Sequence, residues 1–227
     1  MELRDAIRGT GSVRSFTDEP VDDATLYAML DDARFAPSGG NRQGWRVVVV
    51  RDPATRLAIG ELMRTVWDDY IAVASTGDTP FTSIPPSQYQ VTAVAPGRTP
   101  NDLIDHIAEV PVVLVIAADL SLISMMDKDL ERKPITGGGS IYPFCWNLLL
   151  AARSRGLGGV LTTFLARAEP AAASLLDLPP TYAIAGTVFC GHPVHQPTRL
   201  KRRPVEAFTT IDRFGGEPFS LPAEPED

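Results

Sequence analysis

Cysteine and histidine are scarce in this chain. Its 227 residues include 2 cysteines and 3 histidines, too few for a structural zinc site, so no metal centre is expected. Cys145 falls in an apolar helical run and Cys190 in an apolar strand run, which predicts two separate core thiols. This cysteine usage suits a reducing compartment. No histidine stands beside a serine or cysteine in a hydrolase motif, which argues against a nucleophile–base pair.

The chain also lacks a net positive charge and long apolar runs. The formal net charge is -7, which argues against a general nucleic-acid binder, although a local arginine cluster could still grip one phosphate. The longest apolar runs, 110–118 and 148–152, fall well short of the roughly 20 residues that cross a bilayer. The first residues show no apolar stretch typical of a secretory signal. We therefore expect a cytoplasmic protein without membrane or nucleic-acid partners.

The glycine patterns that bind nucleotides are missing as well. Gly137–Gly139 precedes a helical pattern but does not closely follow a strand, and it lacks the GxGxxG spacing. Gly156–Gly159 follows a helix, which is the wrong side for a phosphate-binding turn. A Rossmann dinucleotide-binding domain is therefore disfavoured, and no P-loop is present.

The chain does contain enough apolar residues, 44%, for a substantial core in one large domain or two small ones. Apolar spacing predicts several helices: 2–8, 22–35, 53–74, 120–130, 140–155 and 170–176. Apolar runs predict buried strands at 47–50, 110–118, 160–164 and 182–190, with a candidate turn at 205–208 and a candidate edge strand at 209–211. This order predicts an α/β or α+β sandwich with helices on both faces of a central sheet.

A proline-rich stretch interrupts these elements between residues 76 and 100. It holds five of the 20 prolines in the chain and shows no periodicity. A long irregular stretch inside a compact domain is usually a functional lid or a mobile loop. We favour a lid that covers a ligand pocket. A surface excursion without a role is the alternative.

A polar turn joins the second predicted helix to the first predicted strand. Pro37 should end the helix, while Gly39 and Gly40 allow a sharp bend and a close approach to the backbone. Ser38, Asn41 and Gln43 supply both donors and acceptors. Such a turn suits a flat heteroaromatic ligand with amide-like edges; an ordinary helix-to-strand loop is the alternative.

Four blocks of sequence in one order carry a family resemblance. They are Ser12-Val-Arg-Ser-Phe16, the polar turn, Asn147–Ala152 with Gly156–Gly159, and Leu200–Val205. This pattern resembles the FMN-dependent nitroreductase family from about Glu2 to Ile211, with unclear correspondence over 76–109. The resemblance implies an FMN-binding domain at 1–211, a lid or substrate-pocket insertion at 76–109, and a C-terminal extension at 212–227 that is either frayed or wraps a partner. It also implies an α+β fold with a mostly antiparallel sheet flanked by helices, in an intertwined homodimer with FMN at the interface.

The resemblance also assigns residues to the cofactor. It places Ser12 and Arg14 on the phosphate and ribityl chain, and Arg202 on the phosphate. The family often has another arginine where this chain has Thr10, and Arg8 is the cation that could replace it. The polar turn would contact the ring and ribityl chain, often across the subunit interface, through Pro37, Ser38, Gly39, Asn41 and Gln43. The other ring face would meet Leu161, Thr162 and Thr163, with a backbone N–H or a threonine hydroxyl donating to N5. No protein side chain is expected to be catalytic.

The function implied by the resemblance is an NADH- or NADPH-dependent oxidoreductase with ping-pong kinetics. Its acceptor would be an electron-poor small molecule such as a nitroaromatic or a quinone, in a pocket partly walled by Trp67, Phe81 and Tyr89. A flavin-binding carrier or sensor without turnover is the alternative from another class. Reductive dehalogenation, suggested by Thr162-Thr163, and flavin fragmentation are further alternatives within the same superfamily.

Overall fold

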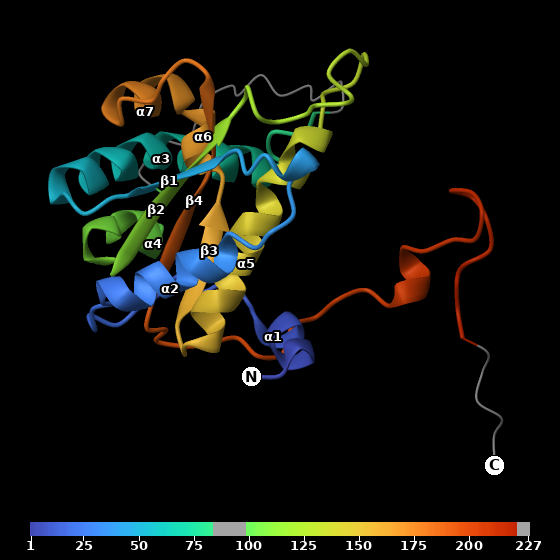
Figure 1. Cartoon of the computed structure of the whole chain (residues 1–227), viewed down its shortest axis with the longest axis horizontal. Helices are drawn as coiled ribbons and strands as arrows, with labels where there is room; N and C mark the ends of the chain where they lie inside the picture. Colours follow the sequence, from blue (N-terminus) through green and yellow to red (C-terminus); the bar gives the residue numbers. More distant parts are fainter. Residues whose placement is uncertain (84–98, 222–227) are drawn as a thin grey trace.

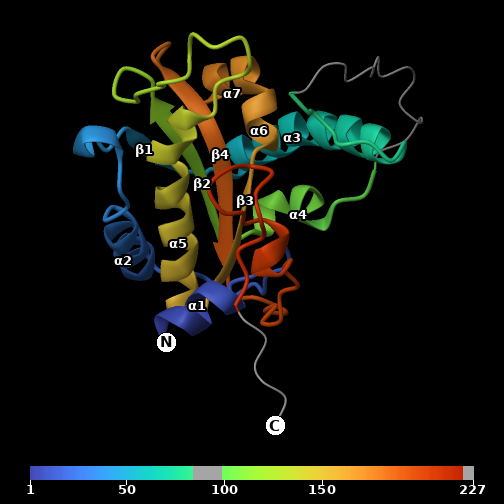
Figure 2. The same cartoon turned by 90° about the vertical axis from the view of Figure 1, so that its right-hand side faces the viewer.

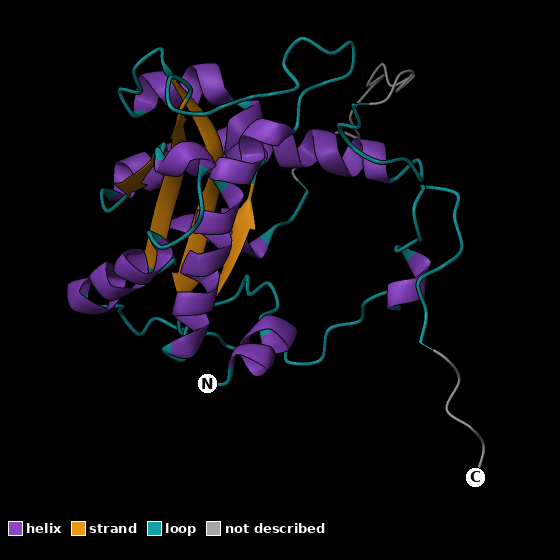
Figure 3. Cartoon of the chain, turned by 45° about the vertical axis from the view of Figure 1, so that its right-hand side comes forward, coloured by secondary structure: helices purple, strands orange, loops and turns teal. Residues whose placement is uncertain are grey.

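The computed structural model describes residues 1–83 and 99–221, which fold around one sheet (Figures 1 and 3). The helices are α1 (Leu3–Gly9), α2 (Asp23–Ala33), α3 (Pro53–Ala74), α4 (Asp102–Asp105), α5 (Tyr142–Ser154), α6 (Phe164–Arg167) and α7 (Glu169–Leu175). The strands are β1 (Trp45–Val49), β2 (Val112–Asp119), β3 (Gly158–Thr162) and β4 (Tyr182–Gly191). Short 3₁₀ turns lie at Gly39–Asn41, Ile107–Glu109, Thr136–Ser140 and Val205–Ala207. No helix in these two ranges is long and apolar enough to cross a membrane.

The sheet has the order β1-β2-β4-β3, and every neighbouring pair is antiparallel. This confirms the expected α+β fold with a mostly antiparallel sheet. β2 lies in the middle, and its first seven residues are buried. Leu114 and Ile116 face the side covered by α2 and α5, whereas Val113 and Val115 face the side covered by α3, α4, α6 and α7 (Figure 2). Alternate side chains of one strand therefore build both halves of the core.

The strand predicted at 47–50 was expected to be covered on both faces, and this is only partly so, because Val47 packs against one half of the core and Val48 against the other but neither is fully buried. β1 is an edge strand of the described sheet, and its Arg46 and Val49 side chains are exposed. A run of β-branched residues also suits an edge strand, because such residues favour extended backbone whether one face or both are covered.

Three helix boundaries follow local rules that the sequence already shows. The Asp22 side chain accepts from the Thr25 N–H at 2.6 Å, and the Asp52 side chain accepts from the Thr55 N–H at 2.7 Å. Gly156 ends α5 with φ of 77°, and the Leu157 N–H reaches back to the Ala152 carbonyl at 3.0 Å. These are two N-caps and a Schellman end.

The helix expected at 120–130 is absent, because a buried carboxylate organises this stretch as a loop. Asp127, only 5% exposed, accepts from Arg132, from the Ile135 and Thr136 N–H groups and from the Thr136 hydroxyl. These bonds reach five to nine residues along the chain. They join Asp127 to groups beyond residue 130, and side-chain to backbone hydrogen bonds of this kind compete with helix formation.

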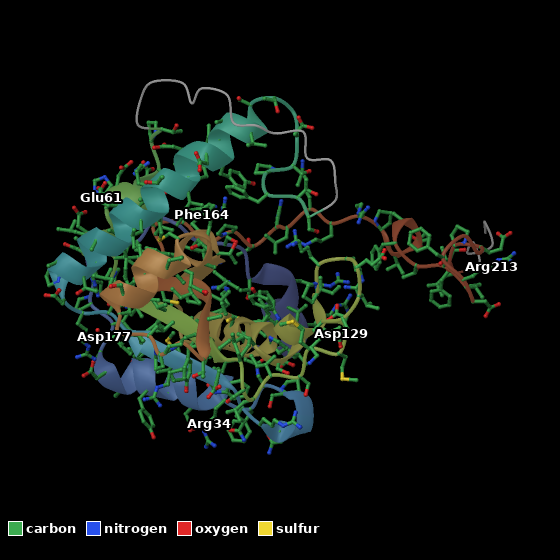
Figure 4. The ribbon with its side chains drawn as sticks, turned by 90° about the horizontal axis from the view of Figure 1, so that it is seen from above. Arg34, Glu61, Asp129, Phe164, Asp177 and Arg213 are labelled. Atoms are coloured by element: carbon green, nitrogen blue, oxygen red, sulfur yellow. The ribbon has the colours of Figure 1, made fainter. Side chains whose placement is uncertain are left out.

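Two further expectations are corrected. The helix predicted at 140–155 begins later than expected, because the N-cap residue of α5 is Ile141 and the Ser140 hydroxyl accepts from the Gly39 N–H. The segment 209–211 does not join the central sheet, because Thr210 pairs with Pro218 in a small hairpin. This hairpin belongs to an arm, residues 204–221, that extends away from the sheet and its helices (Figures 1 and 4, where Arg213 marks it).

Candidate functional site

The segment Ser12–Arg14 lies against the start of β3. Ser12 and Gly159 form a parallel bridge, and the Val13 N–H donates to the Gly159 carbonyl at 3.0 Å. Val13 is 2% exposed, whereas Ser12 and Arg14 are exposed. Because alternate residues of an extended segment face opposite sides, the serine hydroxyl and the arginine guanidinium leave on one open side.

Beyond this bridge, the outer edge of β3 is open. The Gly159 carbonyl points away from β4, toward Val13. Backbone groups two residues apart in a strand point to the same edge, so the Leu161 N–H and carbonyl face outward as well. No strand among the described residues pairs with Leu161 on that side. The chain thus offers a free backbone donor beside the Ser12–Arg14 segment.

The Thr162 hydroxyl is in a different environment. Thr162 pairs in register with Thr187 of β4, and both hydroxyl oxygens are buried without a hydrogen-bond partner in the described part of the chain. Thr162 shares a strand face with Val160, whose side chain packs in the core half under α3. The hydroxyl therefore faces the protein interior, and the backbone is the better donor to a ligand at the strand edge.

The arginines considered for the cofactor phosphate line two different cavities. Arg14 lines a cavity of about 440 Å³ together with Asp102, His106 and Glu109. Arg202 lines another, of about 620 Å³, together with Arg8. Arg14 and Arg202, which the resemblance assigns to one phosphate, are thus separated within a single chain.

The polar turn before β1 has an unusual backbone. Gly40, Asn41 and Gln43 have φ of 60°, 53° and 52°, and the left-handed region is costly for residues other than glycine. The Ser38 hydroxyl accepts from the Gln43 N–H at 2.9 Å, and the Gln43 side-chain amide donates to Asn41 Oδ1 at 3.2 Å. Internal hydrogen bonds therefore hold the turn, and both amide side chains remain exposed.

A second loop holds this turn in place. The Gly39 N–H donates to Ser140 Oγ at 3.1 Å, and Arg42 Nη1 donates to Ser124 Oγ at 2.7 Å. Ser124 and Ser140 both belong to the 120–140 stretch that Asp127 organises. Sequence reasoning did not assign them this role, because no local pattern joins positions about a hundred residues apart.

The turn and the Ser12–Arg14 segment lie at opposite edges of the sheet. The turn precedes β1, and Ser12 pairs with β3, while β2 and β4 lie between these two strands (Figure 2). One chain therefore does not bring Pro37, Asn41 or Gln43 close to Leu161.

Aromatic side chains gather immediately after β3. Phe164, labelled in Figure 4, follows Thr163. The centroid of its ring lies 5.7 Å from that of Trp67 and 5.8 Å from that of Tyr70, both in edge-on geometry. Trp67 stacks on Tyr70, and Tyr70 contacts Phe81 at 6.3 Å. Trp67 and Phe81, predicted to line a pocket, are thus joined through Tyr70, which its spacing of three from Trp67 could have indicated. The third predicted residue, Tyr89, lies outside the described residues.

Neither cysteine is available for chemistry. Burial raises the pKa of the Cys145 and Cys190 thiols to about 12, and both are fully buried and unpaired. Across the described ranges, no group of three or more histidine, cysteine or acidic side chains could hold a metal ion.

Comparisons with known proteins point in one direction. The model of the nitroreductase family matches residues 7–192. A NADH dehydrogenase of Thermus thermophilus is 27% identical over 221 residues, covering 86% of this chain and 88% of that protein. A 5,6-dimethylbenzimidazole synthase of Rhodospirillum rubrum is 29% identical and covers 85% and 86%. A nitrobenzene nitroreductase of Ectopseudomonas oleovorans is 26% identical and covers 92% and 96%.

Solved structures share the fold at lower identity. The NADPH:FMN oxidoreductase of Vibrio harveyi, complexed with NAD⁺, superposes with a TM-score of 0.66 at 20% identity, covering 93% of this chain and 77% of that one. An iodotyrosine deiodinase bound to FMN and 3-iodo-L-tyrosine gives 0.65 at 19% identity and covers 94% and 100%.

Proposed function

The chain belongs to the nitroreductase family of oxidoreductases, and on that premise we propose that it is an FMN-dependent enzyme that uses NADH or NADPH to reduce an electron-poor acceptor such as a nitroaromatic or a quinone. When bound, FMN would supply electron transfer between the nicotinamide and the acceptor. The chain itself would supply binding, orientation and exclusion of water.

The observation that carries this proposal is the pairing of Ser12 and Val13 with Gly159. It brings a hydroxyl and a guanidinium beside an open strand edge with a free backbone donor. Ser12 and Arg14 would hold the phosphate end of the cofactor by charge-assisted hydrogen bonds. The Leu161 N–H would donate to N5 of the ring, with Thr163 continuing the same edge, whereas the Thr162 hydroxyl faces the interior and would not reach the ring.

The opposite placement of the polar turn supports a homodimer. Pro37, Ser38, Gly39, Asn41 and Gln43 could meet the cofactor only if a second copy presented them. The arm supports the same conclusion, because Phe208 is 61% exposed and Phe214 fully exposed. Large apolar side chains left uncovered on an extended arm mark an association surface.

The aromatic cluster supports the substrate side of the proposal. Phe164 directly follows Thr163, and the other rings of the cluster pack around it. Trp67, Tyr70 and Phe81 would therefore form a wall of the space beside the cofactor ring. Planar acceptors would pack against such rings in stacked or edge-on geometry.

Anaerobic spectroscopy tests the proposal. Purified protein should be yellow or take up added FMN, bleach with NADH or NADPH, and recover its colour with a nitroaromatic or a quinone. Protein that refuses FMN would contradict the proposal. Protein that binds FMN but does not bleach would support the carrier or sensor instead, and colour recovery with a halogenated aromatic alone would support dehalogenation.

The 29% identity to a 5,6-dimethylbenzimidazole synthase favours one second candidate, fragmentation of the flavin itself. Aerobic incubation with FMN and NADH, followed by mass spectrometry, would detect 5,6-dimethylbenzimidazole if this reaction occurs. Stable FMN under these conditions would exclude the candidate.

A further inference from the structure

An exposed arginine lies at one end of the aromatic cluster. Arg167 is the last residue of α6, and its guanidinium carbon lies 5.6 Å from the centroid of the Phe81 ring. Phe164 stands three positions earlier on the same short helix, so the two side chains project from one side of it. Arg167 therefore adds a positive charge to a group of rings that begins directly after Thr163.

The backbone of Phe81 is held in an unfavourable conformation. Its φ is 56°, and the left-handed region is costly for a bulky residue. The Phe81 ring lies 6.3 Å from that of Tyr70, between centroids, and beneath the Arg167 guanidinium. Strained residues of this kind are concentrated at binding and active sites. Phe81 thus joins the ring cluster to the cation at the expense of backbone strain.

The chain leaves the charge of Arg167 unpaired. No ion pair in the described ranges includes it. Glu169 is only two residues away, but its carboxylate accepts from the Ile184 N–H at 2.6 Å. A guanidinium stacked on a ring keeps its N–H donors free, because they lie in its own plane. Arg167 can therefore bind an anion without leaving the ring.

Arg34 provides a comparison within the same chain. Its guanidinium carbon lies 4.6 Å from the centroid of the Phe35 ring, and its Nε donates to the Asp31 carboxylate at 2.6 Å. Arg167 makes the ring contact but lacks the carboxylate. A carboxylate carried by a ligand would complete the same arrangement.

We propose that Arg167 binds a carboxylate on the acceptor, so that the preferred acceptor is an aromatic acid. This inference rests on the proposed function, in which the rings of the cluster form a wall of the acceptor site. The acceptor ring would pack against Tyr70 and Phe81, and its carboxylate would receive paired, charge-assisted hydrogen bonds from the guanidinium. Because a chain of net charge -7 repels anions in general, one unpaired cation beside the rings would select where an anion binds.

Two acceptors that differ in charge test the proposal on the flavin-loaded protein. Arg167→Met keeps an unbranched side chain but removes the charge. It should lower kcat/KM for 4-nitrobenzoate about tenfold, the effect of a lost charge-assisted hydrogen bond, and leave kcat/KM for methyl 4-nitrobenzoate unchanged. Arg4→Met is the matched control, because it removes the same charge from an exposed position on α1. If Arg167→Met and Arg4→Met give the same values for the acid, the proposal is overturned.

The phosphate of NADPH is the other anion that Arg167 could meet. The KM values for NADPH and NADH, measured with the neutral ester as acceptor, separate the two sources. The proposal expects neither value to change in Arg167→Met. A higher KM for NADPH alone, with 4-nitrobenzoate unaffected, would assign Arg167 to the electron donor and overturn the proposal.

Two further variants test how the guanidinium is held. Arg167→Lys should keep part of the preference for the acid, because the charge remains while the paired bonds and the stacking are lost. Phe81→Leu should lower kcat/KM for the acid more than for the ester, because it removes the ring beneath the guanidinium. An equal fall for both acceptors would refute the positioning role of Phe81.

Binding of benzoate, measured by calorimetry, does not depend on turnover. Wild-type protein should bind benzoate, and Arg167→Met should lose this binding. That result in a protein that NADH and NADPH do not bleach would uphold the carboxylate site and refute the enzyme. Reduction of the ester together with no benzoate binding would uphold the enzyme and overturn the site.

Discussion

At the scale of single residues, a buried arginine fixes the segment that precedes α4. Arg64 is 5% exposed, pairs with Asp105 and donates to the Thr99 carbonyl. Arg64→Met should lower the free energy of unfolding by about 3 kcal/mol, because it breaks a buried ion pair and removes the donor to the Thr99 carbonyl. Arg34→Ala, which removes an exposed pair with Asp31, should cost under about 1 kcal/mol. Urea denaturation measures both; equal losses would refute the structural role of Arg64.

The two core thiols give a second prediction at this scale. Since burial raises the pKa of Cys145 and Cys190 to about 12, the folded protein should not react with a thiol reagent at pH 8, where little thiolate forms. Denatured protein should react with two equivalents of the reagent per chain. Rapid labelling of the native state at either position would show that the thiol is accessible after all.

At the scale of elements, the stability of the 120–140 loop should depend on pH through one side chain, that of Asp127. The Thr136 hydroxyl, the Ile135 N–H and Arg132 hold the pKa of Asp127 well below its ordinary value of 3.8. Its stabilising contribution is therefore fully present above about pH 4 and is lost as the pH falls further. Asp127→Asn should lower the melting temperature at pH 7 and flatten its decline between pH 5 and 2. The exposed Asp129→Asn is the control; if its profile matches that of Asp127→Asn, Asp127 does not organise the loop.

Elements also show what sequence patterns can and cannot predict. The caps at Asp22, Asp52 and Gly156 were predictable because each depends on neighbours within five residues. The loop at 120–130 was not, since a single buried carboxylate overrode a helical pattern through distant partners. The resemblance assigned both Arg8 and Arg202 to a phosphate, but the packing of Gly11 against Pro197 and Leu200, which brings their segments together, joins positions about 190 residues apart and has no local signal in the sequence.

At the scale of the whole molecule, mixed dimers test whether two copies build each site. Arg14→Ala and Asn41→Ala homodimers should both bind FMN weakly. A dimer of one chain of each kind should regain one intact site, because both substitutions fall in the other, and so should bind half the wild-type flavin tightly. Differently tagged chains, purified in sequence, allow the flavin to be counted. If the mixed dimer is no better than its parents, the polar turn does not serve the partner's site.

The opposite positions of β1 and β3 have a consequence for how the protein behaves on dilution. If cofactor affinity exists only where two sheets face each other, then separating the subunits and losing the flavin are one equilibrium, and added FMN should tighten the association by mass action. The colour of the bound flavin would then measure how much dimer is present. A diluted sample should lose its bound flavin, and the same sample supplied with excess FMN should keep bound flavin and remain dimeric.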